Sequence, residues 1–126
     1  MGGKKQHLLV VDDDTLSSRI VAQTLKAKGY TVSTASDGSA ALYILAHNAH
    51  VDMVVADHHG LELLEAIKDT RRSMPVVIVS DDPAVAESVN QWDNLSVQCK
   101  LEDPHDHAAR VLGAVVSMMP AARPLC

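Results

Sequence analysis

The stretch Val51-Asp-Met-Val-Val-Ala-Asp57 decides the fold, because an almost unbroken apolar run ends there in a carboxylate. Short continuous apolar runs are typical of strands that are covered on both faces, as in parallel sheets. Two further runs, at residues 8–11 and 76–79, have the same character. We therefore predict that these three segments are the central strands of one parallel sheet.

Two other segments, at residues 30–34 and 95–99, alternate apolar with polar residues, as edge strands do. Helical patterns lie between the strands and after the last one. Five helices are predicted. The first carries Leu16, Ile20, Val21 and Leu25 and is closed by Gly29, the second runs over 40–46 and ends near Asn48, and the third carries Leu61, Leu64 and Ile67. The fourth starts at Asp82 and Pro83 and carries Val85, Val89 and Trp92, and the last has an apolar stripe of Ala108, Val111, Leu112, Val115, Val116 and Met119. Strands that alternate with helices imply right-handed crossovers, and the edge assignment selects the strand order 2-1-3-4-5. The prediction is an α/β fold of the flavodoxin-like, doubly wound (βα)5 type.

Polar residues follow the strands of this predicted sheet. Asp12 and Asp13 come after the first strand, Asp57 ends the third, Ser80 follows the fourth and Lys100 follows the fifth. An open parallel sheet binds its ligand outside the carboxyl ends of its strands. These five residues, far apart in the sequence, are therefore predicted to share one pocket.

Length and charge set limits on the function. The 126 residues predict a single domain, residues 1–126, with a core from about 6 to 119 and a short tail at 120–126. The net charge is -5 and the Lys and Arg residues are scattered, so we expect no direct binding to nucleic acid. No apolar stretch approaches the roughly 18 residues that cross a bilayer, and the N-terminus lacks the apolar region of a signal peptide. We expect a cytoplasmic protein without membrane insertion.

The ordered set of motifs resembles the receiver domains of two-component response regulators. Val10-Val-Asp-Asp-Asp14, Asp57, Pro75-Val-Val-Ile-Val-Ser80 and Lys100 match the family's site in order and approximate spacing. The resemblance implies that Asp57 accepts a phosphoryl group and that Asp12 and Asp13 hold Mg²⁺ together with it. Ser80 and Lys100 would contact the phosphoryl oxygens.

The resemblance also implies the partners of such a domain. The phosphoryl donor would be a sensor histidine kinase or a phosphotransfer protein, and the signal would pass to a downstream protein target or output domain through a change of the protein surface. The chain would be no enzyme beyond catalysing its own phosphorylation and dephosphorylation. The residue types suit this chemistry: a divalent cation relieves the repulsion between crowded carboxylates, and phosphoryl transfer needs charge neutralisation on the equatorial oxygens.

Three positions differ from the family pattern. Receivers usually place a glycine eight residues beyond the phosphorylated aspartate, whereas Gly60 follows Asp57 after three. Val97 occupies the position of the switch Tyr or Phe, and Leu101 replaces the customary proline after Lys100. The usual aromatic switch cannot operate, so we expect the output to move to the loop after Asp57 and the following helix.

Alternative interpretations accompany this hypothesis. A pseudo-receiver would keep the fold and act by protein contact without phosphorylation, whereas a flavin or dinucleotide binder is disfavoured because no glycine-rich phosphate loop follows the first strand. His58 and His59 beside the carboxylates raise a second hypothesis, a zinc, nickel or copper site, although a hydrogen-bonding role is the simpler expectation.

Several further residues receive a structural interpretation. Asp14 is expected to cap the first helix. Trp92 is expected in the core, Cys99 as a small buried apolar residue, and His105 and His107 on the solvent side before the last helix. Cys99 and Cys126 have neither a metal-type spacing nor a disulfide framework, so both are expected as reduced thiols.

Overall fold

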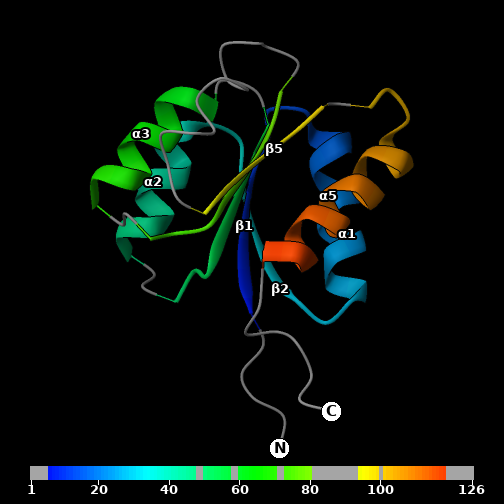
Figure 1. Cartoon of the computed structure of the whole chain (residues 1–126), viewed down its shortest axis with the longest axis horizontal. Helices are drawn as coiled ribbons and strands as arrows, with labels where there is room; N and C mark the ends of the chain where they lie inside the picture. The colour runs from blue at the N-terminus through cyan, green and yellow to red at the C-terminus, as the bar shows by residue number, and fades with distance from the viewer. Residues whose placement is uncertain are drawn as a thin grey trace, which may run out of the picture.

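The computed structural model describes residues 6–47, 50–57, 60–70, 73–80, 94–99 and 101–118. Within these residues, five strands form one parallel sheet in the order β2-β1-β3-β4-β5 (Figure 1). The predicted strand order and doubly wound fold are confirmed. The strands are β1 (His7–Val11), β2 (Thr31–Ala35), β3 (Met53–Asp57), β4 (Val76–Val79) and β5 (Leu95–Gln98).

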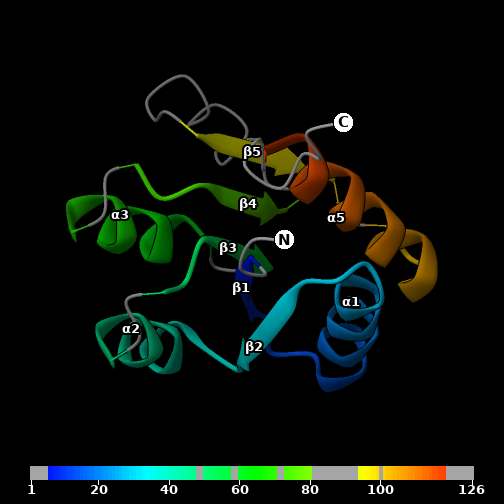
Figure 2. The same cartoon turned by 90° about the horizontal axis from the view of Figure 1, so that it is seen from below.

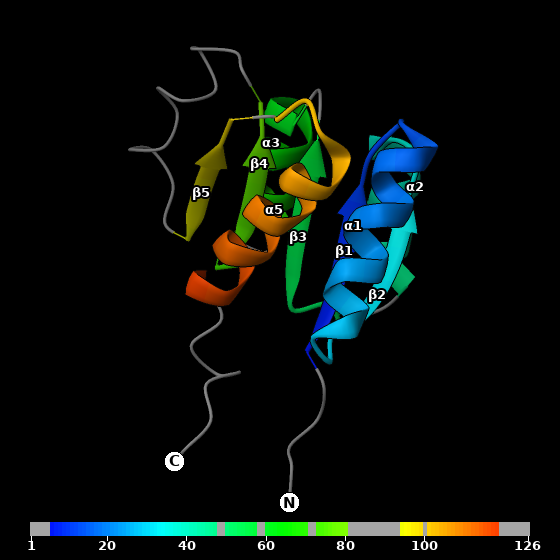
Figure 3. The ribbon, with the colours of Figure 1, turned by 90° about the vertical axis from the view of Figure 1, so that its right-hand side faces the viewer.

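Helices cover both faces of the sheet. Figure 2 shows α1 (Thr15–Ala27) and α5 (Pro104–Met118) on one face, and α2 (Gly38–His47) and α3 (Gly60–Thr70) on the other. Viewed from the side in Figure 3, α1 and α5 lie next to each other across the strands. The helix predicted to start at Asp82, with Trp92 on its apolar face, lies outside the described residues.

The core consists of two apolar layers that the sheet separates. Along β1, Leu8 and Val10 contact the layer under α1 and α5, whereas Leu9 and Val11 contact the layer under α2 and α3. Residues of β3 and β4 alternate in the same way, and nearly all of them are fully buried. Strands buried on both faces need apolar residues at every position, which explains the continuous runs in the sequence.

Helix α1 has well-defined ends. The Asp14 carboxylate accepts hydrogen bonds from the N–H groups of Leu16 and Ser17, which confirms its predicted role as the N-cap. At the other end, Gly29 has a φ of 99°, a conformation that favours glycine. The Tyr30 N–H donates back to the Leu25 carbonyl, which completes the turn into β2.

The buried faces of α1 and α5 differ from the predicted stripes. Leu16 is 59% exposed and Val116 is 53% exposed, so neither belongs to the core. The buried face of α1 includes Ser17 and Ser18 instead. An apolar spacing alone does not identify such small hydroxyl side chains as buried.

The burial of two further residues differs from the prediction. His107 was expected in solvent before the last helix, but it lies in the first turn of α5 and is only 3% exposed. Cys99 was expected to be buried, but it is an exposed free thiol directly after β5. The strand ends at Gln98, so the alternation that would bury Cys99 does not continue to it.

A buried lysine closes the connection between α3 and β4. The Lys68 side chain is 2% exposed, and its Nζ donates a hydrogen bond of 2.8 Å to the Met74 carbonyl oxygen. A buried ammonium needs such partners to offset its lost hydration. Separately, none of the helices in the described ranges is long and apolar enough to cross a membrane.

Candidate functional site

The carboxyl ends of the central strands lie side by side at one edge of the sheet. Strands β1 and β3 pair in parallel with Val11 opposite Ala56, so the register continued by one residue sets Asp12 opposite Asp57. Neighbouring strands are about 4.8 Å apart, which places the backbones of these two aspartates next to each other. On the far side of β3, Asp57 pairs with Val79, the residue before Ser80.

Asp12 is the buried acid of this edge. It is 4% exposed, its N–H donates to the Ala35 carbonyl at 3.0 Å, and its Oδ1 accepts the Asp14 N–H at 2.9 Å. Backbone and side chain are thus both fixed by neighbouring segments. Asp13, by contrast, is exposed. The two predicted metal ligands therefore differ in how firmly they are held.

Ser80 follows β4 and is half-buried. Its N–H donates to the Gln98 carbonyl at 3.0 Å, which ties the end of β4 to the end of β5. Lys100 lies outside the described residues, two positions after Gln98 along the chain. Four of the five predicted site residues thus have described backbone positions at the ends of β1, β3 and β4.

The connection between β3 and α3 is short. Strand β3 ends at Asp57 and α3 begins at Gly60, so two residues, His58 and His59, join them. Both histidines lie outside the described residues, and the transition-metal hypothesis stays a prediction. On β5, Val97 is half-buried and packs against the core layer under α2 and α3. A β-branched residue therefore occupies the position at which the family pattern has an aromatic ring.

The described residues supply part of a metal donor set. Asp12 and Asp13 offer carboxylate oxygens, the ligands that Mg²⁺ prefers, at the strand end next to Asp57. Within the described ranges, no three His, Cys, Asp or Glu side chains form a group that could hold a metal ion. A complete metal shell would therefore need residues beyond these, such as the side chain of Asp57.

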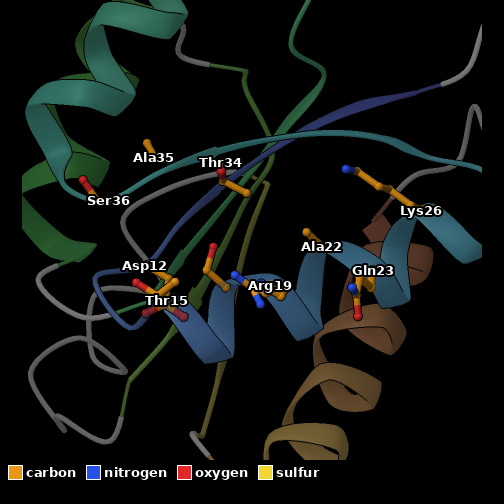
Figure 4. A pocket seen from close by; sticks show the side chains of 10 residues that line it. Asp12, Thr15, Arg19, Ala22, Gln23, Lys26, Thr34, Ala35 and Ser36 are labelled. Atoms are coloured by element: carbon orange, nitrogen blue, oxygen red, sulfur yellow. The ribbon is translucent and has the colours of Figure 1, made fainter.

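A groove beside this edge was not predicted from the sequence. It has a volume of about 430 Å³ and lies between α1 and the end of β2, with Asp12 at one end (Figure 4). Arg19 and Lys26 of α1 line it, as do Gln23 and the β2 residue Thr34. The spacing of Arg19 and Lys26, two helical turns apart, could have indicated that both lie on one face of α1.

Comparison with protein families gives a match over most of the chain. The family model of the response regulator receiver domain matches residues 8–99, which include all of the sheet except His7 and end one residue before Lys100. The chain belongs to the response regulator receiver domain family. The matched residues include Asp12, Asp13 and Asp57, on which the resemblance in the sequence motifs also depends.

Individual relatives of this receiver domain are distant. It is 32% identical over 94 residues to the transcriptional regulatory protein GlrR of Escherichia coli, covering 71% of this chain but 21% of that protein. To the two-component response regulator ORR11 of Oryza sativa subsp. indica it is 31% identical over 88 residues, covering 64% of this chain and 60% of that protein. The chain thus spans only part of the length of these relatives.

Solved receiver structures share the fold. A response regulator receiver protein from Sinorhizobium medicae superimposes with a TM-score of 0.77 at 22% identity, covering 95% of this chain and 98% of that one. A CheY-like receiver domain protein from Methanospirillum hungatei gives a TM-score of 0.74 at 21% identity, covering 94% and 99%. The fold of the receiver domain is therefore retained at low sequence identity.

Proposed function

We propose that this receiver domain accepts a phosphoryl group on Asp57. The observation that carries the proposal is the register between β1 and β3, which sets buried Asp12 opposite Asp57 at the carboxyl end of the sheet. A ligand of a doubly wound sheet binds at this edge, next to the point where the strand order reverses. Membership of the receiver family supports the same assignment.

The acidic residues fit a magnesium ion. Asp12 and Asp13 supply oxygen donors, and Asp57 would add a third. When bound, Mg²⁺ would supply charge neutralisation for the carboxylates and the phosphoryl oxygens. The Asp14 N–H holds the Asp12 carboxylate in place before any ligand arrives, so that this donor is preorganised.

In the proposed transfer, a carboxylate oxygen of Asp57 attacks the phosphorus atom and forms a P–O bond. The bond between phosphorus and the donor's leaving atom breaks, and the leaving group keeps that electron pair. Ser80, held at the end of β4 by its hydrogen bond to Gln98, would donate its hydroxyl to a phosphoryl oxygen. Lys100 would neutralise a further oxygen as an ammonium.

The proposed partners follow from this chemistry. A sensor histidine kinase or a phosphotransfer protein would donate the phosphoryl group, and a downstream protein or an output domain would read the change. The relatives support this setting, since one is named a transcriptional regulatory protein and another a two-component response regulator. We place the reaction in the cytoplasm, where such kinases present their phosphohistidine.

Two observations favour a second candidate function. Only two residues separate Asp57 from α3, and Val97 replaces the switch aromatic, so a receiver that acts by phosphorylation-independent protein contact is the alternative. Such a pseudo-receiver would keep the same fold and acidic edge. Phosphorylation distinguishes the two functions directly.

The test is incubation with acetyl phosphate and Mg²⁺, followed by intact-mass analysis. We expect a gain of one phosphoryl group in the wild type and none in Asp57→Asn. The matched control is Asp106→Asn, which changes an exposed aspartate of α5 far along the chain and should be phosphorylated as the wild type is. No adduct in the wild type would favour the pseudo-receiver, and an adduct that persists in Asp57→Asn would contradict the assignment of the phosphoacceptor.

A further inference from the structure

The groove between α1 and β2 lies at the open edge of the sheet. Strand β2 pairs only with β1 and ends the sheet on that side in the described part of the chain (Figure 2). The groove, with its volume of about 430 Å³, runs along α1 next to this strand (Figure 4). A sheet edge of this kind is where an extended peptide can add as a further strand.

The hydrogen-bond pattern shows which backbone groups of β2 face outward. The Thr31 N–H donates to the Gln6 carbonyl, and the Ala35 carbonyl accepts the Asp12 N–H. In a parallel pair, alternate residues direct both backbone groups to the same neighbour. Thr31, Ser33 and Ala35 therefore face β1, whereas the N–H and C=O groups of Val32 and Thr34 face away from it.

The side chains along the groove carry positive charge. Arg19 and Lys26 are exposed on α1, and Gln23 lies between them. Neither the Arg19 nor the Lys26 side chain makes an ion pair within the described part of the chain. Asp12, the acid at the end of the groove, has its Oδ1 engaged by the Asp14 N–H. The groove thus complements negative charge, although the whole chain has a net charge of -5.

From the outward backbone groups of Val32 and Thr34 and the two cations beside them, we infer that this groove binds an extended acidic peptide of a partner protein as a sixth strand. Alternate side chains of that strand would face α1, about 7 Å apart. Arg19 and Lys26 are two helical turns, about 10.5 Å, apart. Two acidic residues separated by one other residue would therefore reach both cations, since the long Arg and Lys side chains span the remaining distance.

A second copy of this chain is the less favourable occupant. Pairing of two β2 edges would bring the Arg19 and Lys26 side chains of one copy toward those of the other, and like charges at short range repel. A heterologous acidic strand meets no such repulsion. This inference does not rest on phosphorylation at Asp57, because it uses the outward side of β2 and the cations of α1.

The probe is a fluorescein-labelled peptide of about seven residues in which valine and glutamate alternate, the length of an ordinary strand. Two matched peptides carry lysine in place of glutamate, or N-methyl groups on the amides that would pair with β2. Fluorescence anisotropy on the full chain should show binding of the acidic peptide alone, weakening as salt is added. Equal binding of the lysine or N-methylated peptide, or no binding of any peptide, would overturn the inference.

Variants of the chain locate the site. Combined Arg19→Glu and Lys26→Glu should weaken binding at least about tenfold, because two charge-assisted hydrogen bonds are lost. Thr34→Pro removes one outward N–H without touching the pairing with β1, and should also weaken binding. The control is Arg110→Glu, an exposed cation of α5 outside the groove, which should change the affinity by less than about twofold.

Circular dichroism and sedimentation complete the test. Unchanged spectra and melting temperatures of the variants would assign a loss of binding to the groove. If Thr34→Pro unfolds, the N-methylated peptide still tests strand pairing on the wild type. The inference would be contradicted if the charge-reversal variant bound the acidic peptide as tightly as the wild type does. It would also be contradicted if the wild type sedimented as a dimer that the Thr34→Pro change dissociates, because a second copy would then occupy the edge.

Discussion

The backbone N–H of Asp14 donates a hydrogen bond of 2.9 Å to Oδ1 of Asp12, while the Asp14 carboxylate caps α1. One residue therefore links the start of a helix to the buried acid of the site. The link fixes the Asp12 carboxylate relative to the start of α1.

Asp12→Asn should separate the two roles of this carboxylate. Asparagine can still accept the Asp14 N–H, but it lacks the negative charge that Mg²⁺ requires. Without metal, we expect the variant to be more stable than the wild type by about 1 kcal/mol, because one of the crowded charges is removed. Mg²⁺ should raise the melting temperature of the wild type and leave that of Asp12→Asn unchanged. Equal stabilisation of both proteins by Mg²⁺ would exclude Asp12 as a ligand.

Asp14→Ala should destabilise the domain through its helix cap. The variant loses the acceptor for the N–H groups of Leu16 and Ser17, at a cost of about 1 kcal/mol. Urea unfolding measures this difference. Asp14→Ser, which keeps a capping oxygen, should recover most of the stability, and a serine variant as unstable as the alanine variant would argue against capping.

Lys68→Met should be among the more destabilising changes of a charged residue. The Met74 carbonyl would lose the donor that reaches it at 2.8 Å inside the protein, at a cost of about 2 kcal/mol. Glu65→Met, on the same helix but exposed, should change the free energy of unfolding by less than about 0.5 kcal/mol. A Lys68→Met variant as stable as its control would show that the buried ammonium costs as much as it contributes.

Neighbouring valines of α5 should respond very differently to a charge. Val115 is fully buried, so Val115→Lys should cost more than about 3 kcal/mol or prevent folding. Val116 is 53% exposed, and Val116→Lys should be nearly neutral. Thermal melts of the two variants test the observed face of α5 against the predicted stripe, which placed both valines in the core.

Phosphorylation should change hydrogen exchange mainly at α3. Only two residues connect Asp57 to this helix, and Val97 provides no aromatic ring to transmit a rearrangement through β5. We expect altered protection between residues 58 and 70 in the phosphorylated protein, measured against Asp57→Asn. Changes confined to β5 and the segment before it would contradict this route.

The sheet could be predicted because its strands carry a strong and simple signal. Residues 8–11, 53–56 and 76–79 are apolar at every position, a pattern that strands covered on both faces require. The order of the strands followed from which of them alternate. The last residue of a strand cannot be predicted in the same way. The alternation of apolar and polar residues does not show that β5 stops at Gln98 and leaves Cys99 exposed.

The helices show where the sequence signal weakens. His107 lies four, seven and eight residues before Val111, Ala114 and Val115, so its spacing placed it on the buried face of α5 although its chemistry favoured solvent. The groove beside β2 could not be predicted for a different reason. Its cations become neighbours of Thr34 only when α1 packs onto the sheet, a relationship that lies in the tertiary structure.

The two-residue connection after β3 has an electrostatic consequence. Three virtual bonds of about 3.8 Å join the Cα atoms of Asp57 and Gly60, so the start of α3 lies within about 11 Å of Asp57. The first turn of a helix carries a partial positive charge. Negative charge gained at Asp57 would lie close to this pole, and α3 would act as a built-in counter-charge that the covalent chain keeps within this distance.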